Sequence, residues 1–539
     1  MSELLFHYKK VNPTTWAYLS SLLMIGLYFK FSRFWSVRNI DLVLLVLLAP
    51  GLLLTYYGRE NERNAWFYYR QALASEAAKD QATSEMQPAD GAASNSSDGP
   101  SALGSDAGGA TSEPKKPLDP PGEKPVEKPG DSAAGQSAPD DSATSAAKDE
   151  AVDPVKRAEK RWKDARADLK LGFIWLLAIG VVFLGRMLVD PTMVRRPLLE
   201  PNLSMGGLIF IGCSLFVFLM ANVITSIPTD DELNGARRAE QLLKREKIAE
   251  EDHDLARRGP GYALLNLLPV VPTMSLMNPP SGTGDPLDAY AITSKAMAIL
   301  SHLAVVIGIV AIGYRHFDNL RMGIGAATMY LMLPYTAVMT GRVDHVLPSA
   351  LLIWAIACYR RPLSAGVLIG LATGVVYYPI FLLPLWVSFY WQRGVWRFIL
   401  GLGPTLALMV LSLIFVSADL VEFRMNVQKM FGLWFPTREG LEGIWGLGWD
   451  PVYRLPILTA FVAMSCSLAI WPAQKNLGTL LSCSAAVMVG TQFWHGHGGG
   501  LYMAWFLPLI LLTIFRPNLE DRVALAVLSD GYSPPRRAA

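Results

Sequence analysis

The chain is poor in charged residues and in cysteine. Only 17% of its 539 residues are Asp, Glu, Lys or Arg, whereas 51% are hydrophobic. This balance differs from that of soluble domains and predicts an integral membrane protein. The four cysteines lie in apolar runs without CxxC spacing, which argues against a disulfide framework and a zinc–thiolate site.

Several familiar motifs are also missing. The chain has no GxxxxGK[ST], GxSxG or HExxH segment, which argues against ATP-driven transport, a serine hydrolase and a zincin. No small-residue cleavage site separates the first apolar run, residues 16–29, from the second, which begins at Ile40, so we predict no signal peptide. The net charge of +2 does not point to nucleic acid, and we expect no nucleic-acid partner.

Apolar runs recur along the chain and predict about 13 transmembrane helices in a multi-pass protein of the inner (cytoplasmic) membrane. We therefore predict an all-α polytopic bundle with the lipid bilayer as its surroundings. The runs assigned to crossings are residues 15–31, 40–57, 171–188, 205–224, 291–313, 323–340, 346–359, 363–376, 380–391, 398–416, 456–470, 477–489 and 501–515.

Composition divides the chain into segments. Residues 75–160 are rich in Ala, Ser, Pro and Asp, a composition that buries too little apolar surface to fold and predicts a disordered linker. Residues 229–258 carry mixed charges and predict a solvated surface helix. Pro269 and Pro272 interrupt the next apolar piece, which we expect to be re-entrant or interfacial. The segments are an N-terminal transmembrane hairpin (1–74), the linker (75–160), a second transmembrane hairpin (161–228), the charged helix with the re-entrant loop (229–290), a transmembrane core (291–517) and a cytoplasmic tail (518–539).

Short basic loops indicate the orientation of these helices. Loops rich in Lys and Arg face the cytoplasm by the positive-inside rule. The basic residues concerned are those of loop 30–38, the pairs Arg315/Arg321, Arg360/Arg361 and Arg393/Arg397, Lys475 and the C-terminal tail. The opposite, outer face then holds the N-terminus, the turns at 341–345 and 377–379, the loop 417–454 and the turn 492–500.

A charged pentad, residues 341–345, interrupts the apolar sequence between two basic clusters. The run after it, 346–358, has only about 14 residues, and the hairpin at 363–391 contains two runs of similar length. Helices of that length reach about 21 Å, less than the roughly 30 Å of the hydrocarbon core. The turns at the pentad and at 377–379 should therefore lie below the membrane surface on one side.

Ionisable side chains at such a depth are costly and often functional, and two interpretations are open. In the first, Arg342, Asp344 and His345 line the walls of a cavity. Tyr377 and Tyr378 form its floor. In the second, Arg342 and Asp344 are a buried ion pair that joins two helices, and His345 is a hydrogen-bonded histidine of the hairpin.

The predicted outer face collects groups suited to sugar transfer from a lipid phosphate. Asp285 and Asp288, just before the fifth crossing, offer a carboxylate as general base. Arginine and lysine can bind phosphate, and aromatic rings suit the apolar faces of a sugar or an isoprene. The candidate substrate-binding residues are Arg342, Asp344, His345, Tyr377, Tyr378, Lys429, Arg438, His495 and His497.

A divalent metal is an alternative at this face. His495 and His497 are two residues apart in a glycine-rich turn and could bind a metal together with Asp344 or His345. Because a His-x-His pair is weak evidence, we assign no metal ligand and no cofactor.

A pattern of small and apolar residues runs through the second half of the chain. Leu333-Pro334 and the pentad precede the arginine pair 360–361, an Ala-Gly-x-Leu-x-Gly-Leu-Ala helix at 365–372 and the turn Tyr378-Pro379. Trp445-Gly446-Leu447 and Tyr502-x-x-Trp505-x-x-Pro508 follow later. Over roughly 291–517 these segments resemble the bacterial polyprenyl-phosphate-mannose branch of the C-type (GT-C) glycosyltransferases.

The resemblance implies a GT-C-like helical bundle and a mannosyltransferase-like activity. It implies a polyprenyl-phosphate-linked sugar as donor and a glycan, lipid or protein outside the cytoplasm as acceptor. Two departures stand out. Arg342 and Asp344 replace the family's Gln and Asn, and Val375 or Val376 replaces a Lys at a helix end.

The family's catalytic acid lies in the first outer loop and is not marked by a motif here. On topology, Asp285 or Asp288 is our first choice, Asp190 the second and Asp41 the third.

Two other classes of function use the same features. A transporter or flippase of lipid-linked sugars should show internal repeats, and we find no clear repeat. A non-catalytic membrane scaffold would depend on the linker.

Overall fold

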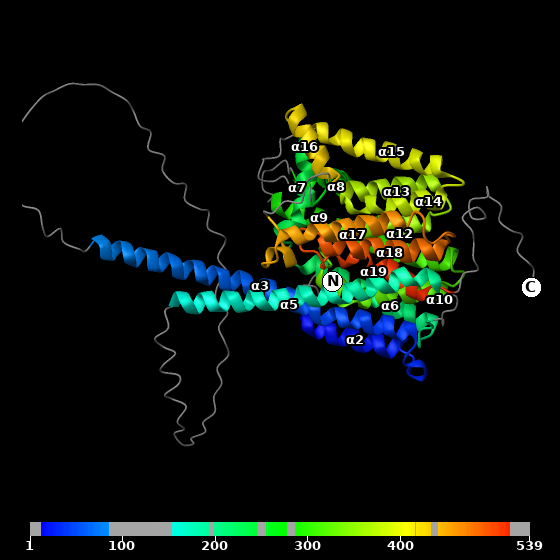
Figure 1. The fold of residues 1–539 in the computed structure, drawn as a ribbon, viewed down its shortest axis with the longest axis horizontal. Coiled ribbons are helices and arrows are strands. Elements are labelled where there is room, and N and C mark those ends of the chain that lie inside the picture. Colours follow the sequence, from blue (N-terminus) through cyan, green and yellow to red (C-terminus); the bar gives the residue numbers. More distant parts are fainter. Residues whose placement is uncertain are drawn as a thin grey trace, which may run out of the picture. The chain divides into compact units, whose positions relative to one another are not determined.

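The computed structural model describes residues 12–85, 154–193, 199–244, 255, 257–277, 286–415, 417–432 and 440–517. Within these ranges the regular structure is helical and no strand occurs, as predicted (Figure 1). The helices are α2 (Pro13–Tyr28), α3 (Val37–Glu85), α5 (Pro154–Val189), α6 (Met205–Thr225), α7 (Asp230–Lys244), α8 (Pro260–Met277), α9 (Pro286–Arg315), α10 (Leu320–Met332), α11 (Pro334–Val338), α12 (Val343–Ala357), α13 (Pro362–Val375), α14 (Leu383–Tyr390), α15 (Val395–Ser412), α16 (Leu420–Met430), α17 (Arg454–Ser467), α18 (Leu477–Trp494) and α19 (Leu507–Phe515).

The chain forms two compact units, and the smaller one, Arg63–Lys163, contains the end of α3 and the start of α5. Trp162 stacks on Tyr69 at 5.8 Å between ring centroids and lies 5.1 Å from Trp66, so aromatic contacts join the two helical arms. Both ends of the predicted linker 75–160 are helical, which corrects that boundary. Ala, Glu, Gln and Lys favour helix there. The remainder of the linker lies outside the described residues.

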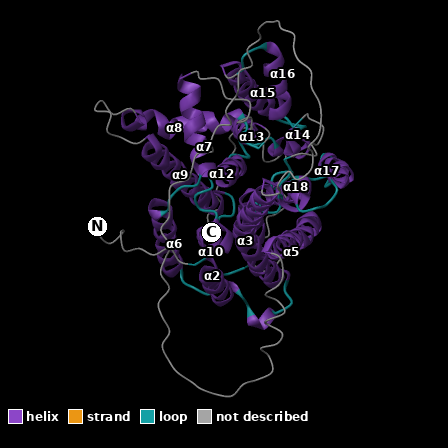
Figure 2. Cartoon of the chain, turned by 90° about the vertical axis from the view of Figure 1, so that its left-hand side faces the viewer, coloured by secondary structure: helices purple, strands orange, loops and turns teal. Residues whose placement is uncertain are grey.

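The larger unit, residues 1–62 with 164–539, is a bundle whose helices run side by side (Figure 1), and Figure 2 looks along many of them. Six helices of the described chain are long and apolar enough to cross a membrane, which supports a membrane protein. They are Val37–Ala78, Pro154–Thr192, Met205–Thr225, Ala289–Arg315, Val395–Phe415 and Leu477–Trp494. The count of about 13 crossings stays a prediction.

Four further apolar helices are shorter than a full crossing. They are Val343–Ala357, Pro362–Val375, Tyr378–Tyr390 and Met503–Phe515. The first three confirm that the helices after the pentad are short. The run 323–340 is not one helix, because α10 ends before Leu333 and α11 begins at Pro334. A residue that precedes proline avoids the helical conformation, which explains the break.

The core of the larger unit is built around α18. Nearly every side chain of α18 is buried, and it packs on α19, α17, α14 and α12. A helix that is apolar on all sides must be surrounded by other helices or by lipid, and α18 is surrounded by other helices. The side chain of Asn476 caps its first turn by accepting the N–H of Thr479 at 2.9 Å. The other end of α18 carries Trp494 and leads directly into the turn with the two histidines.

Helices α13 and α15 approach closely through glycines. A Cβ atom on Gly366 would lie 2.2 Å from the Phe398 carbonyl oxygen, and one on Gly401 would lie 2.1 Å from that of Leu363. Small residues that allow such backbone contact are a common way to pack helices in a membrane.

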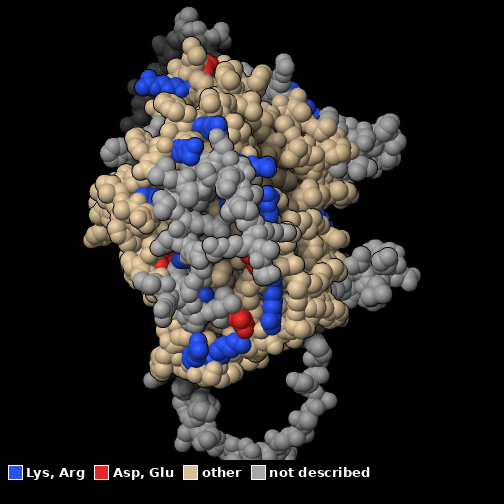
Figure 3. All heavy atoms as spheres, turned by 90° about the vertical axis from the view of Figure 1, so that its right-hand side faces the viewer, with Lys and Arg blue, Asp and Glu red and all other residues tan. Residues whose placement is uncertain are grey.

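Hydrogen bonds identify the two ends of the bundle. At one end, Lys30 Nζ donates to Asn202 Oδ1 at 2.7 Å, and Arg321 donates to the carbonyl oxygens of Pro201 and Leu203 at 3.1 and 2.8 Å. We call this the basic end. Its surface shows more Lys and Arg than Asp and Glu among the described residues in view (Figure 3). The start of α12 lies at the opposite end, because its last carbonyl, of Ala357, accepts from His316 just after α9.

Alanine at Gly366 or Gly401 should destabilise the bundle because the added methyl group meets backbone. We expect a loss of about 1–3 kcal/mol in the free energy of unfolding for each variant, measured by thermal unfolding in detergent. Gly403→Ala, also on α15, is the matched control because nothing lies within 4 Å of the position that its methyl group would take. Equal melting temperatures for all three variants would contradict the close packing.

Candidate functional site

A buried carboxylate, Asp344, lies at the centre of an ion-pair cluster at the end of the bundle opposite the basic end. Arg342 binds it with two contacts, Nε to Oδ1 at 3.0 Å and Nη2 to Oδ2 at 2.8 Å. Arg258 donates to Oδ2 at 3.2 Å. The Asp344 side chain is only 3% exposed, so both guanidinium groups are needed to offset the cost of burying its charge.

A second carboxylate, Asp231 of α7, extends the cluster toward solvent. It lies 2.8 Å from Arg342 Nη1, 3.2 Å from Arg258 and 3.6 Å from Arg257. Its side chain is 41% exposed. Desolvation raises the pKa of Asp231, but Arg342, Arg257 and Arg258 outweigh this effect and hold the pKa below its ordinary value. Asp231 is therefore charged at neutral pH and accessible from outside the cluster.

Local sequence explains how α7 presents this group. Thr229 and Glu232 form a capping box, in which the Thr229 N–H donates to Glu232 Oε2 at 2.8 Å. The negative charges of the first turn also stabilise α7, because they interact favourably with the positive end of the helix dipole. One face of α7 is buried, at Leu233, Ala236 and Ala239 among others, which corrects the prediction of a solvated helix over 229–258. The apolar positions recur every three or four residues but are too few for the sequence to reveal a buried face.

The arginine pair of the cluster comes from the turn before α8. Gly259 follows Arg258, and its N–H donates to the Val375 carbonyl at 2.8 Å. A Cβ atom there would lie 2.3 Å from the Gly374 carbonyl oxygen, so glycine is required for this close approach. Pro260 then starts α8, where its missing N–H costs nothing. The turn thus fastens Arg257 and Arg258 to the end of α13.

Aromatic rings continue from the ion pairs into the bundle. Tyr502 Oη accepts a hydrogen bond from Arg257 Nε at 3.2 Å. Its ring lies 4.2 Å from that of His345 and 4.5 Å from that of His495, centroid to centroid. The next ring is Tyr378, 4.7 Å from His495 and 4.1 Å from Tyr377. These five rings form a continuous aromatic row beside the cluster.

The turn after α18 holds this row in place. Gln492 Oε1 accepts the N–H groups of Gly500 and Tyr502 at 3.1 and 3.3 Å. The N–H of Glu442 donates to the Gly496 carbonyl at 2.8 Å, which joins the long loop to the turn. Glu442 is also 3.7 Å from Arg257. Three of the predicted outer segments, namely the pentad, the long loop and the histidine turn, therefore meet at one place.

The pentad forms the buried ion pair of the second interpretation. Asp344 and His345 are 2% and 3% exposed as whole residues, and His345 Nδ1 is 2.6 Å from Tyr335 Oη. They are packed among neighbours and do not line an open cavity, which corrects the first interpretation. The reason is that Arg258 and Tyr335, brought in from other segments, fill the space beside them.

The other predicted site residues have different positions. Lys429 is in the last turn of α16, and within the described chain it forms no ion pair with the cluster. Gly432, just after α16, lies against the ring of Tyr377 with a φ of +63°. Asp285 and Arg438 lie outside the described residues.

The carboxylates described at the cluster, Asp344 and Asp231, are not among the predicted catalytic residues. Asp288 belongs to the first turns of α9, where the neighbouring Tyr290 contacts Glu240. Glu240 is nine residues from Asp231, about 14 Å along α7. The second and third choices, Asp190 and Asp41, are fully buried and bind Arg186 at 2.9 Å each. Arg516, at the basic end, also binds Asp190, so neither carboxylate faces the cluster.

Sequence reasoning missed Asp231, Arg257 and Arg258 as site residues, and it gave Tyr502 only as part of the resemblance. The Arg-Arg-Gly-Pro-Gly segment at 257–261 is a detectable signal, because paired charges before a rigid turn are well placed for binding. Its position at the end of the charged stretch 229–258 hides this signal.

The histidine turn shows internal hydrogen bonding. His495 Nδ1 accepts the backbone N–H of His497 at 3.0 Å, and the two rings are 6.0 Å apart. Across the described part of the chain, no group of three or more His, Cys, Asp or Glu side chains is placed to hold a metal. The donor groups that the site does present are guanidinium and phenol.

Fold and site together define an all-α, membrane-type protein with an arginine-rich ion-pair cluster at one end of its bundle. Comparison with protein-family models, curated proteins and solved structures gives no match.

Replacing Asp344 should destabilise the protein far more than replacing Asp231. Asp344→Leu leaves two buried guanidinium groups without their carboxylate, and we expect a loss of about 3–5 kcal/mol. Asp231→Leu removes a half-exposed partner and should cost about 1 kcal/mol or less. Thermal unfolding in detergent measures both.

Asp230→Leu is the control for this comparison, because the Asp230 side chain on the same turn of α7 is 95% exposed. Its melting temperature should stay close to that of the unmodified protein, because an exposed charge in the first turn of α7 and its 3.9 Å ion pair with Arg237 together contribute about 0.5 kcal/mol or less. Similar losses for Asp344→Leu and Asp231→Leu would show that burial does not decide the strength of these ion pairs.

Proposed function

We propose that this protein is an integral membrane glycosyltransferase of the GT-C type. It transfers a hexose, of the mannose kind, from a polyprenyl-phosphate sugar to an acceptor glycan, lipid or protein at the outer face of the cell membrane. The observation that carries the proposal is the arginine cluster bordered by aromatic rings at one end of the bundle.

Two arginines of the cluster can reach a donor phosphate. The side chains of Arg257 and Arg342 are 13% and 15% exposed, whereas that of Arg258 is 1% exposed. Guanidinium groups bind phosphate oxygens through two parallel hydrogen bonds. Arg258 instead keeps Asp344 paired, which leaves part of the hydrogen-bonding capacity of Arg342 for a ligand. These roles replace the pairing of Arg342 with Lys429 or Arg438 that the sequence suggested.

The acceptor hydroxyl needs a general base, and Asp231 is the described carboxylate best placed for it. It is accessible and borders both Arg257 and Arg342. A bound phosphate would share the positive charge of these arginines, so the pKa of Asp231 would rise toward a value suited to proton transfer. Asp288 remains the alternative from the sequence.

The contacts of Tyr502 also support a donor site at Arg257, because this tyrosine connects Arg257 to the aromatic row. It accepts a hydrogen bond from Arg257, and its ring lies between those of His345 and His495 in tilted contacts, so movement of Arg257 toward a phosphate would alter the contacts of the aromatic row. Aromatic faces suit the apolar side of a sugar ring. The short helices α12 and α13 begin or end beside this region, which brings the site close to lipid-linked substrates.

Arg257→Gln should abolish transfer of mannose from polyprenyl-phosphate mannose in proteoliposomes, because the donor phosphate loses its accessible guanidinium. Asp231→Asn should do the same, while Asp288→Asn should retain activity if Asp231 is the base. Arg237→Gln is the matched control, since Arg237 lies on α7, is 39% exposed and is not part of the cluster.

Each variant must first show the melting temperature of the unmodified protein, so that loss of activity is separated from loss of fold. Normal transfer by Arg257→Gln and Asp231→Asn would end the proposal. Loss of transfer in Asp288→Asn alone would support the glycosyltransferase activity but would assign the general base to Asp288 on α9.

The cluster and the basic end should be accessible from opposite sides of the membrane. In a variant without the four native cysteines, Glu442→Cys and Asp230→Cys should react with a membrane-impermeant maleimide in intact cells. Arg33→Cys and Arg393→Cys should react only after the membrane is permeabilised. The reverse pattern would place the cluster in the cytoplasm and contradict an outer-face donor site. Labelling of all four from outside would contradict the placement of the two ends on opposite sides of the membrane.

A further inference from the structure

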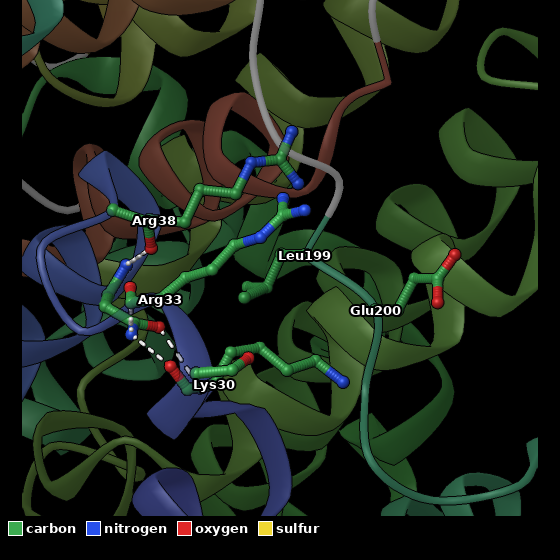
Figure 4. Close-up of a pocket in the computed structure, with 8 residues that line it drawn as sticks. Lys30, Arg33, Arg38, Leu199 and Glu200 are labelled. Carbon is green, nitrogen blue, oxygen red and sulfur yellow. Dashed lines mark hydrogen bonds between the residues drawn. The ribbon is translucent and has the colours of Figure 1, made fainter.

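A pocket of about 320 Å³ lies at the basic end, away from the ion-pair cluster (Figure 4). It is formed by the loop between α2 and α3 together with residues 199–200. The side chains of Lys30, Arg33 and Arg38 extend toward the segment that carries Leu199 and Glu200 (Figure 4). Three cationic side chains and one carboxylate therefore line the pocket, which favours an anionic ligand.

The walls of the pocket are held in place by buried hydrogen bonds. Asn39 is 1% exposed, and its side-chain N–H groups donate to the carbonyl oxygens of Lys30 and Arg33 at 2.9 and 3.0 Å. Its Oδ1 accepts the Lys30 N–H at 3.2 Å. Arg38 is 4% exposed and donates to the Arg516 carbonyl at 3.1 Å. The loop is thus preorganised, and little ordering is needed when a ligand binds.

One guanidinium in this site is available to a ligand. The side chain of Arg33 has no hydrogen bond or ion pair with any described residue, and it points along the pocket with Arg38 (Figure 4). Lys30 keeps two further N–H donors beside its bond to Asn202. Ser32 and Ser36 also line the pocket. This set of donors matches the oxygens of a phosphate group.

Exposed aromatic residues locate the loop at the depth of lipid headgroups. Phe31, Phe34 and Trp35 are 73%, 55% and 83% exposed, and Phe34 packs edge-on against Trp35. Aromatic side chains at the ends of transmembrane helices lie at the membrane interface. The next turns of α3 expose Ile40 and Val43, at 42% and 44%, which suit acyl chains. Phosphate donors and a lipid-facing apolar surface are therefore adjacent.

We propose that this pocket binds the headgroup of an anionic phospholipid from the leaflet at the basic end. The phosphate would lie between Lys30 and Arg33, with Arg38 behind it, and the acyl chains would follow α3. Basic pockets beside transmembrane helices on the cytoplasmic side commonly take such headgroups. The proposal is independent of the glycosyltransferase assignment, because the pocket and the ion-pair cluster are at opposite ends of the bundle.

The test is thermal unfolding of the full-length protein in neutral detergent with dioleoylphosphatidylglycerol, dioleoylphosphatidylcholine or inorganic phosphate added. A ligand that binds the folded state raises the melting temperature, and the stabilisation grows with the logarithm of the ligand concentration divided by its Kd. Only phosphatidylglycerol should stabilise the unmodified protein. Its apparent affinity should fall roughly fivefold in Arg33→Gln or Lys30→Gln and about 30-fold in the double variant.

Arg393→Gln is the matched control, because Arg393 is an exposed arginine that does not line the pocket. It should keep the full response to phosphatidylglycerol. All variants should melt like the unmodified protein without lipid, since neither Lys30 nor Arg33 is buried. An unchanged response in Arg33→Gln and Lys30→Gln, or an equal loss in Arg393→Gln, would overturn the site. Equal stabilisation by inorganic phosphate would overturn the lipid assignment and indicate a site for free phosphate.

Discussion

One buried carboxylate shared by two arginines organises the end of this bundle that we consider functional. Asp344 accepts from Arg342 and Arg258 while almost no solvent reaches it. A charge in that position is stable only if its partners stay in place, because an unpaired buried ion costs several kcal/mol. The start of α12 and the turn before α8 must therefore remain together, and Asp231 ties α7 to both. Trp505 Nε1 also donates to the Asp344 carbonyl at 3.4 Å, which links the segment before α19 to the same point.

Burial divides the arginines into two roles. Arg258 is enclosed and neutralises Asp344, whereas Arg257 and Arg342 keep part of their surface open and border an accessible carboxylate. Structural and ligand-binding functions need not compete in such a cluster, since different guanidinium groups carry them. The pentad therefore contributes mainly to the structural ion pair through Asp344, while Arg342 is partly exposed and the other accessible groups, Arg257 and Asp231, come from other segments.

The ends of the bundle differ in how they hold charge. At the cluster, cations and carboxylates are paired within the protein. At the basic end, Asp41, Arg186 and Asp190 form a buried ion-pair network, and the pocket there presents the unburied cations Lys30 and Arg33 beside the buried Arg38. The excess of basic side chains at that end agrees with the positive-inside rule. The hydrogen bonds of Arg321 to the segment 201–203 also place the segment before α6 and the segment after α9 at the same end of the bundle, so α7 and α8 between them do not reverse the order of the helices.

The sequence by itself determined the helical class, the apolar helices and their shortness after the pentad. These features depend on local composition and run length, which the chain carries directly. It also singled out the pentad, Tyr377, Tyr378 and the histidine turn. The tertiary structure was needed to show that Asp344 is enclosed, that Arg258 reaches it, and that Arg257, Glu442 and Tyr502 complete the surroundings. Those contacts join residues 86 to 245 positions apart, and burial and ion pairing between such distant segments leave no periodic trace in the sequence.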